Sequence, residues 1–211
     1  METTHTFERN KENSIVKERF GWIHNWCDNE NDHDKPRILL VGDSIVCGYQ
    51  QKVRDALSEV CYVDYLATSY SIDEPFYKQL LLGTVKRSKY DLVFFNFGLH
   101  GGHIGGRSYR AGYEKLLKDI LKYATAVPVT STRVLKKGSS VQDPAWRRRL
   151  VVRNRIVAEL AEKHSLALLD LYAVSTQMPA SLQGGDGIHF TDEGYAALCA
   201  AVAKKAKELL G

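Results

Sequence analysis

The chain has 211 residues, of which 44% are hydrophobic, so it is long enough to bury the core of one α/β domain. Its 29 basic and 25 acidic residues give a net charge of +4. The densest basic cluster, Arg147-Arg148-Arg149 with Arg153 and Arg155, has no interleaved aromatic residues. It therefore predicts a solvated helix face rather than a nucleic-acid-binding surface.

The N-terminal residues are not expected to act as a signal peptide. Residues 1–13 are polar and charged and lack the apolar core of a signal peptide, and no later run is long and apolar enough to span a bilayer. The chain as written is therefore expected to be cytoplasmic, although a chain whose signal sequence had been removed would look the same. The cysteines show no Cys-x-x-Cys spacing, which predicts reduced thiols rather than disulfides or zinc ligands. They are Cys27, Cys47, Cys61 and Cys199.

Residues 1–35 are expected to form a helical extension and linker ahead of a domain over 36–211. Apolar residues recur there at helical spacing, which predicts a helix packed on the domain. They are Ile15, Val16, Phe20, Ile23 and Trp26 or Cys27. The polar residues 28–35 predict a linker. Two alternatives stay open: these apolar residues form a homodimer contact, or Trp22 and Trp26 line a substrate site.

From residue 37 onwards, predicted strands and helices alternate. Apolar runs bounded by turn residues predict strands at 37–41, 60–66, 91–97, 126–131 and 166–171. Helical spacing and capping residues predict helices after Ser44, at 75–86, 108–123 and 144–164, and after Thr191. Such alternation predicts an α/β fold with a central five-stranded parallel sheet covered by helices on both faces. Ligands then bind beyond the carboxyl ends of the strands.

Two short motifs at opposite ends of this domain carry the chemistry. Gly42-Asp43-Ser44 directly follows the first strand, and Asp186-Gly187-Ile188-His189 lies near the C-terminus. A serine hydroxyl needs a base to take its proton as it attacks, and imidazole titrates near neutral pH, so Ser44 is the predicted nucleophile and His189 the predicted base. Asp186 is then the carboxylate that orients the imidazole.

These motifs resemble the conserved blocks of the SGNH/GDSL hydrolase family, from about Pro36 to the C-terminus. The resemblance implies a three-layer α/β/α flavodoxin-like sandwich and a serine esterase or lipase that needs no metal or other cofactor. In the family, an oxyanion hole is formed by the amide of the serine, the amide of a glycine in a second block and an asparagine of a Gly-x-Asn-Asp block. Here the third block reads Gly98-Leu99-His100-Gly101.

The oxyanion hole is thus where the chain departs from the family pattern. His100 occupies the asparagine position, and an imidazole N–H can donate to a developing oxyanion. The second block lacks its glycine, and the backbone amide of Ser69 is the predicted replacement, since any residue but proline carries that donor. The predicted hole is therefore formed by Ser44, Ser69 and His100. Asp43 and His103 are expected to contact substrate.

The resemblance implies carboxylic esters as substrates. The Gly-Leu-His form of the third block is similar to bacterial members regarded as carbohydrate esterases, which favours removal of O-acetyl groups from a saccharide. The aromatic residues Tyr49, Tyr70, Phe76, Tyr109 and Trp146 are candidates for stacking on sugar rings, with core packing as the alternative. A lysophospholipase, short-chain lipase or thioesterase and an inactive carbohydrate-binding module are the other functions to weigh. A zinc site at His100 and His103 lacks an evident third ligand.

Overall fold

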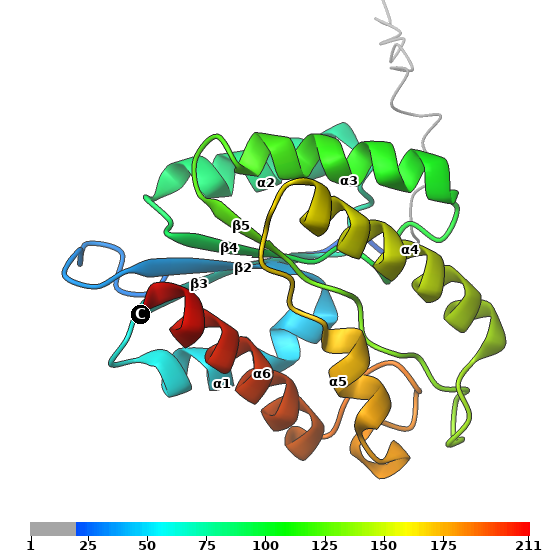
Figure 1. Cartoon of the computed structure of the whole chain (residues 1–211). Coiled ribbons are helices and arrows are strands. Elements are labelled where there is room, and N and C mark those ends of the chain that lie inside the picture. Colours follow the sequence, from blue (N-terminus) through cyan, green and yellow to red (C-terminus); the bar gives the residue numbers. More distant parts are fainter. Residues whose placement is uncertain (1–19) are drawn as a thin grey trace, which may run out of the picture.

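The computed structural model describes residues 20–211 and has a five-stranded sheet at its centre (Figure 1). The strand order is β1-β3-β2-β4-β5. The strands are β1 (Ile23–Trp26), β2 (Arg37–Gly42), β3 (Tyr62–Thr68), β4 (Leu92–Phe95) and β5 (Thr125–Pro128). Strands β2 to β5 pair in parallel, whereas β1 pairs antiparallel with β3. The sheet is thus parallel except at one edge.

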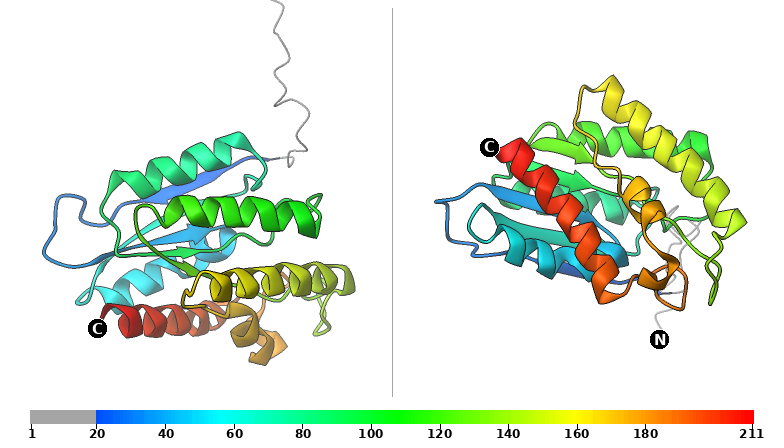
Figure 2. Two further views of the ribbon diagram at one scale, coloured as in Figure 1. Left: turned by 45° about the horizontal axis from the view of Figure 1, so that its top comes forward. Right: turned by 60° about the horizontal axis from the view of Figure 1, so that its bottom comes forward.

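Helices cover both faces of this sheet (Figure 2). They are α1 (Ser44–Leu57), α2 (Pro75–Arg87), α3 (Gly106–Ile120), α4 (Pro144–Lys163), α5 (Leu171–Gln177) and α6 (Asp192–Leu210), with a short 3₁₀ turn, η2 (Ala180–Leu182). Successive side chains of a strand point to opposite faces. Leu40 and Phe94 accordingly pack in the cluster with α1 and α6, and Leu39 and Phe95 in the cluster with α2 and α3.

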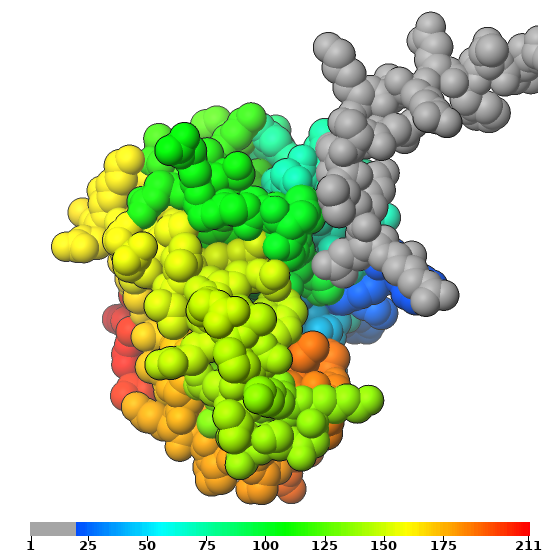
Figure 3. Space-filling model, turned by 90° about the vertical axis from the view of Figure 1, so that its right-hand side faces the viewer, coloured from blue at the N-terminus to red at the C-terminus, as the bar shows by residue number. Residues whose placement is uncertain are grey.

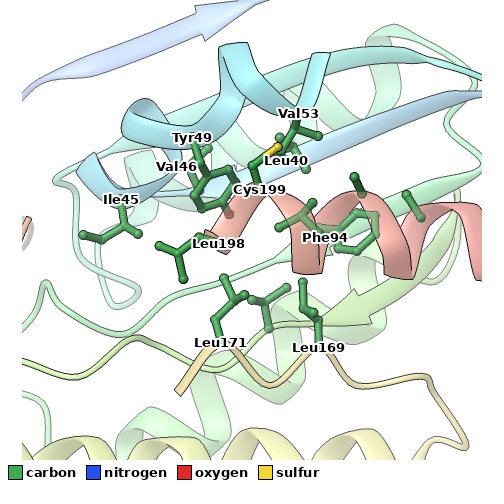
Figure 4. Packing of buried hydrophobic residues seen from close by; sticks show 14 of the residues in the cluster. Leu40, Ile45, Val46, Tyr49, Val53, Phe94, Leu169, Leu171, Leu198 and Cys199 are labelled. Atoms are coloured by element: carbon green, nitrogen blue, oxygen red, sulfur yellow. The ribbon is translucent and has the colours of Figure 1, made fainter. Parts of the chain in front are cut away.

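Helices α1 and α6 are packed tightly together. Figure 4 shows Tyr49 of α1 beside Leu198 and Cys199 of α6, all of them buried. Gly48 allows the close approach, because a Cβ there would lie 2.0 Å from the ring of Tyr195. This contact fixes the N-terminal part of α1 relative to the N-terminal part of α6. It therefore also fixes the chain segments that lead into those two helices.

The predicted helix starts are confirmed at three capping residues. The side chain of Asp43 accepts a hydrogen bond from the Ile45 amide at the start of α1, and Asp143 accepts from two amides at the start of α4. Thr191 accepts from the Gly194 amide at the start of α6. Each cap provides a partner for amides that the first helical turn leaves without one.

The strand predicted at 166–171 is wrong. Leu169 forms a single parallel bridge with Val129, and α5 begins at Leu171. The side chain of Asp170 accepts hydrogen bonds from the Ala173 amide and the Thr130 hydroxyl, which turns the chain out of the sheet. The run is apolar because its leucines pack against both core clusters. Apolar packing on both sides therefore does not require a full ladder of hydrogen bonds here.

The helix predicted within the first 35 residues is wrong over residues 23–26, which form β1, and Ile15 and Val16 lie outside the described residues. Ile23 pairs with Thr68, and Trp26 pairs with Tyr65 of β3. All four side chains of β1 are exposed. Backbone pairing with the free edge of β3, rather than burial of an apolar stripe, decides the conformation of this segment. None of the helices over residues 20–211 combines the length and hydropathy that crossing a bilayer requires.

Candidate active site

Ser44 lies where β2 ends and α1 begins, at the carboxyl edge of the sheet. It is the first residue of the helix, directly after the capping residue Asp43, and its side chain is partly exposed. A strand, a tight turn and a helix in this order bring a side chain to the end of the sheet where parallel folds bind ligands. The amide of Ser44 belongs to the first turn of α1, where amides point out of the helix and favour negative charge.

His189 and Asp186 reach Ser44 from the loop before α6. His189 Nε2 lies 2.8 Å from Ser44 Oγ, and His189 Nδ1 lies 2.5 Å from Asp186 Oδ2. The three predicted residues are thus in contact across 145 positions of sequence. Both ring nitrogens of the histidine are engaged, one by a hydroxyl and one by a carboxylate. The same geometry orients an imidazole to accept a proton from a hydroxyl.

The turn from Asp186 to His189 is held by its own backbone. Oδ1 of Asp186 accepts hydrogen bonds from the amides of Ile188 (2.8 Å) and His189 (2.9 Å). Gly187 between them has φ of +78°, a left-handed conformation that favours glycine. Partial burial raises the pKa of Asp186, but the hydrogen bonds from the His189 ring and the two amides outweigh it and lower the pKa. Asp186 is therefore held as an anion beside the imidazole.

A cavity of about 620 Å³ opens in front of Ser44 and His189. Figure 3 views the molecule from the side where the parallel strands end, and there α4 lies beside the segment that precedes α6. The cavity is lined by two tryptophans, three histidines, an arginine and smaller groups. These residues are Trp22, His24, Ser44, Cys47, Leu99, His100, Gly102, Trp146, Arg149, Ile188 and His189. A mostly apolar cavity with a few polar groups is typical of a small-molecule site.

His100 lines this cavity from the glycine-rich loop between β4 and α3, as its place in the motif predicts. Its ring meets the ring of Trp22 edge to face, with the centroids 6.0 Å apart. Its carbonyl accepts a 2.8 Å hydrogen bond from Arg153 of α4. The side chain of Asn96, which follows β4 directly, donates to the Val129 carbonyl and the Ser131 hydroxyl inside the protein and so does not replace His100 in the cavity.

Arg153 holds the loop that carries His100. The arginine is 1% exposed, although it belongs to the cluster in which the sequence predicts a solvated helix face. Its guanidinium donates to the carbonyls of Gly98, His100, Gly101 and Ile104. The interpretation of the basic cluster is therefore wrong for this residue, because four carbonyls of one loop turn converge on it.

Ser69 does not lie in the cavity, so its place in the predicted oxyanion hole is not supported. Its amide donates to the Trp22 carbonyl at 3.3 Å, and its hydroxyl accepts from the Trp22 amide at 3.0 Å. The residue is 2% exposed. The segment around Trp22 pairs with the end of β3, and this pairing uses the Ser69 amide that was predicted to donate to the oxyanion.

Asp43 and His103, the two predicted substrate contacts, also lie outside the cavity lining. Asp43 is buried beneath the serine, where it caps α1. Burial raises the pKa of its carboxyl, against the opposing effect of His100, the Ile45 amide and His189. His103 turns toward Asp73, with Nε2 and Oδ2 2.9 Å apart. Asp43 thus stabilises the turn before Ser44, and His103 links its loop to Asp73.

Several residues that line the cavity were not predicted from the sequence. Trp22 is the exception, since a wall of the substrate site was one alternative for it, whereas Trp26 is exposed and stacks with Arg54 instead. Of the five aromatic residues considered for sugar stacking, only Trp146 lines the cavity. No local sequence pattern assigns His24 and Arg149 to the cavity, because their places there depend on how β1 and α4 pack in the fold.

The cysteines and potential metal ligands add little to this site. All four cysteines are free, and burial raises the pKa of Cys47, which lines the cavity, to about 11. The thiol therefore stays protonated near neutral pH. Over residues 20–211, no group of three or more histidine, cysteine, aspartate or glutamate side chains is arranged to hold a metal ion.

A serine, a histidine and an aspartate in contact at the edge of an α/β sheet are the arrangement of a hydrolytic enzyme. Residues 40–197 match the model of the GDSL-like lipase/acylhydrolase family. The chain belongs to this family, and it is an esterase or acylhydrolase of the GDSL type. No curated protein matches the chain in sequence.

Solved structures share the fold at low sequence identity. A lipase/acylhydrolase from Enterococcus faecalis is 18% identical with a TM-score of 0.62, over 83% of this chain and 97% of that chain. Axe2, an acetylxylan esterase from Geobacillus stearothermophilus, is 16% identical with a TM-score of 0.66, over 81% and 93%. An aryl esterase from M. smegmatis is 17% identical with a TM-score of 0.69, over 83% and 100%. These likenesses establish the fold.

Proposed function

We propose that Ser44, His189 and Asp186 form a catalytic triad that hydrolyses carboxylic esters through an acyl-enzyme. The observation that carries this proposal is the unbroken set of contacts from Ser44 Oγ through His189 to Asp186, at the mouth of a cavity. We assign residues 36–211 to this hydrolase domain, in the three-layer flavodoxin-like arrangement that the sequence resemblance implies.

The reaction takes two steps with the proton held on His189. In the first, Ser44 Oγ bonds to the acyl carbon while its proton passes to Nε2, which then protonates the departing alcohol oxygen as the ester bond breaks. In the second, water gives a proton to Nε2 and attacks the acyl carbon, and the proton returns to Ser44 as the acid leaves. Asp186 stabilises the positively charged ring in both steps, and its lowered pKa keeps it anionic.

The developing oxyanion is stabilised by two donors in this proposal. The amide of Ser44 is one, because it lies in the first turn of α1. The side chain of His100 is the other, since it lines the cavity in the place of the family's asparagine. Ser69 is left out because its amide already donates to Trp22.

The proposed substrate is an O-acetyl group on a carbohydrate. Trp22 and Trp146 both line the cavity, and indole rings pack well on the apolar faces of sugar rings. The structural neighbour Axe2 is an acetylxylan esterase, which supports this assignment.

Labelling with a fluorophosphonate probe tests the nucleophile. The wild-type protein is expected to be labelled stoichiometrically at Ser44, and Ser44→Ala to lose both labelling and ester hydrolysis while keeping its circular dichroism spectrum. Ser69→Ala is the matched control on a serine outside the cavity and keeps its labelling. More than a few per cent of the wild-type rate in purified Ser44→Ala disproves the nucleophile assignment.

A panel of 4-nitrophenyl esters tests the acyl specificity. 4-Nitrophenyl acetate is expected to have the highest kcat/KM of the panel, and O-acetylated xylose, tested beside it, is expected to be hydrolysed. A kcat/KM that rises steadily from two to ten acyl carbons contradicts the carbohydrate esterase and indicates a lipase or thioesterase that uses the same triad. Absence of hydrolysis together with tight binding of oligosaccharides contradicts the esterase function and indicates a carbohydrate-binding module.

A further inference from the structure

Arg149 is a cation on the cavity wall that the proposed chemistry does not use. It lies on α4, on the turn before the buried Arg153, and lines the same cavity as Ser44 and His189. Its guanidinium carbon lies over the indole ring of Trp146, 4.7 Å from the ring centre. A Cβ on Gly102 would lie 3.4 Å from each terminal nitrogen and 3.5 Å from the central carbon. Such equal distances place Gly102 against the flat face of the guanidinium.

These contacts fix the plane of the guanidinium and leave its N–H edge for other partners. Arg149 takes part in no ion pair or hydrogen bond with another described residue in the structure, whereas its neighbour Arg153 donates to four carbonyls. In the described part of the chain, the cavity lining contains no aspartate or glutamate, and Arg149 is its one arginine or lysine. This permanent cation favours an anionic group on a molecule bound there.

We propose that Arg149 binds a carboxylate on the alcohol part of the substrate, so that the preferred substrate is an O-acetylated acidic sugar. This inference rests on the proposed esterase function and names its substrate class. A guanidinium held by its faces presents two parallel N–H groups in one plane, and a carboxylate accepts both in the same plane. The sugar ring then lies between Trp146 and Trp22, and its acetyl group reaches Ser44. A neutral acetylated sugar makes the stacking contacts but leaves the arginine with water.

Arg149 is thus a specificity-determining residue and takes no part in the bond-breaking steps. Its contact with the carboxylate exists in the bound substrate as well as in the transition state. Such uniform binding lowers KM and leaves kcat nearly unchanged. The KM for the acidic ester is therefore the quantity that responds to a change at this position.

The test compares two isosteric substrates, the tri-O-acetyl methyl glycoside of glucuronic acid and that of its uronamide, with 4-nitrophenyl acetate as reference. Acetate release is measured for the wild type, Arg149→Gln and Arg148→Gln. Arg148 is the matched control, because it is exposed and lines a different hollow of α4, with Val141 and Val151. The wild type is expected to prefer the acid by about tenfold or more in kcat/KM, mainly through KM, as for a charge-assisted hydrogen bond. This preference is expected to shrink as salt is added.

Arg149→Gln is expected to bring the ratio of acid to amide within about twofold of one, mainly through a higher KM for the acid. Arg148→Gln keeps the wild-type ratio. A wild-type ratio near one, or an unchanged ratio in Arg149→Gln, overturns this inference while hydrolysis of 4-nitrophenyl acetate upholds the esterase. Absence of hydrolysis of all three esters, together with absence of fluorophosphonate labelling, overturns the proposed function and this inference with it.

Discussion

Replacing Arg153 with methionine is expected to weaken both the fold and the catalytic loop. The guanidinium donates to Gly98 and His100 at 2.8 Å each, to Gly101 at 2.6 Å and to Ile104 at 3.3 Å. It also lies over the ring of Tyr109, 4.8 Å from the ring centre. Methionine keeps most of the length and the apolar contact with that ring. It removes every donor.

The magnitude follows from what the substitution leaves behind. A hydrogen bond from a charged donor contributes about 1.5–3 kcal/mol, and an unpaired buried acceptor costs about 1–3 kcal/mol. Burial of the guanidinium lowers the pKa of Arg153, a sign that its charge is costly to bury, and the substitution removes that cost. We therefore expect the free energy of unfolding to fall by about 3–5 kcal/mol rather than by the sum of four bonds. A domain with about 5–15 kcal/mol of stability stays folded at 25 °C after such a loss.

Urea unfolding and steady-state kinetics on 4-nitrophenyl acetate measure the two effects. We expect kcat to fall by about tenfold to a hundredfold with little change in KM, because the displaced loop carries His100, which acts as charge develops. Arg153→Lys is expected to have a stability and a kcat between those of the wild type and Arg153→Met, since an ammonium reaches fewer carbonyls. Arg155→Met is the control: Arg155 is 70% exposed, and its ion pair with Glu159 at 3.6 Å contributes at most about 0.5 kcal/mol. An Arg153→Met variant within about 0.5 kcal/mol of the wild type refutes the reasoning.

Four further predictions concern the triad, the oxyanion hole, metals and pH. Asp186→Asn is expected to lower kcat less than His189→Ala, because a base without its orienting partner still accepts protons; the reverse order in steady-state assays contradicts the assigned roles. His100→Ala is expected to lose about a hundredfold in kcat, and His100→Asn to recover part of it, whereas equal rates make His100 a bystander. Dialysis against EDTA is expected to leave the rate unchanged, and a loss restored by zinc contradicts a triad mechanism. Hydrogen bonds from lysine side chains lower the pKa of Glu114 to about 2. The stability that its carboxylate contributes is therefore complete above its usual pKa and is lost as the pH falls through about 2. Urea unfolding at decreasing pH is expected to show this loss in the wild type and not in Glu114→Gln.

The triad and its supporting elements could be predicted because their signals are local. A turn after a buried strand, a capping aspartate and a four-residue motif need only neighbouring residues. The caps at Asp143 and Thr191 and the strand before Ser44 were therefore predicted correctly. Ser44 and His189 are distant in sequence, and the packing of α1 against α6 brings together the segments that lead into these two helices.

The errors arise where a partner far along the chain decides the outcome. Ser69 has an amide like any other, and only the pairing with Trp22 takes it away from the site. Ile23 follows a helical pattern of apolar residues, yet the open edge of β3 makes it a strand residue. Arg153 and Arg149 look alike in the sequence, but one is enclosed by a loop and the other borders the cavity.

The edge strand β1 has a consequence for how specificity can change in this enzyme. Trp22 and His24 line the cavity, but they precede the region that matches the family model, which starts at residue 40. The proposed triad and one side of the cavity thus belong to different stretches of the chain. Substitutions near Trp22 alter one side of the cavity, and a substitution of Trp22 itself also removes its ring contact with His100. Because Trp22 and His24 lie in this segment, exchanging residues 20–27 changes one wall of the cavity and leaves Ser44, Asp186 and His189 unchanged.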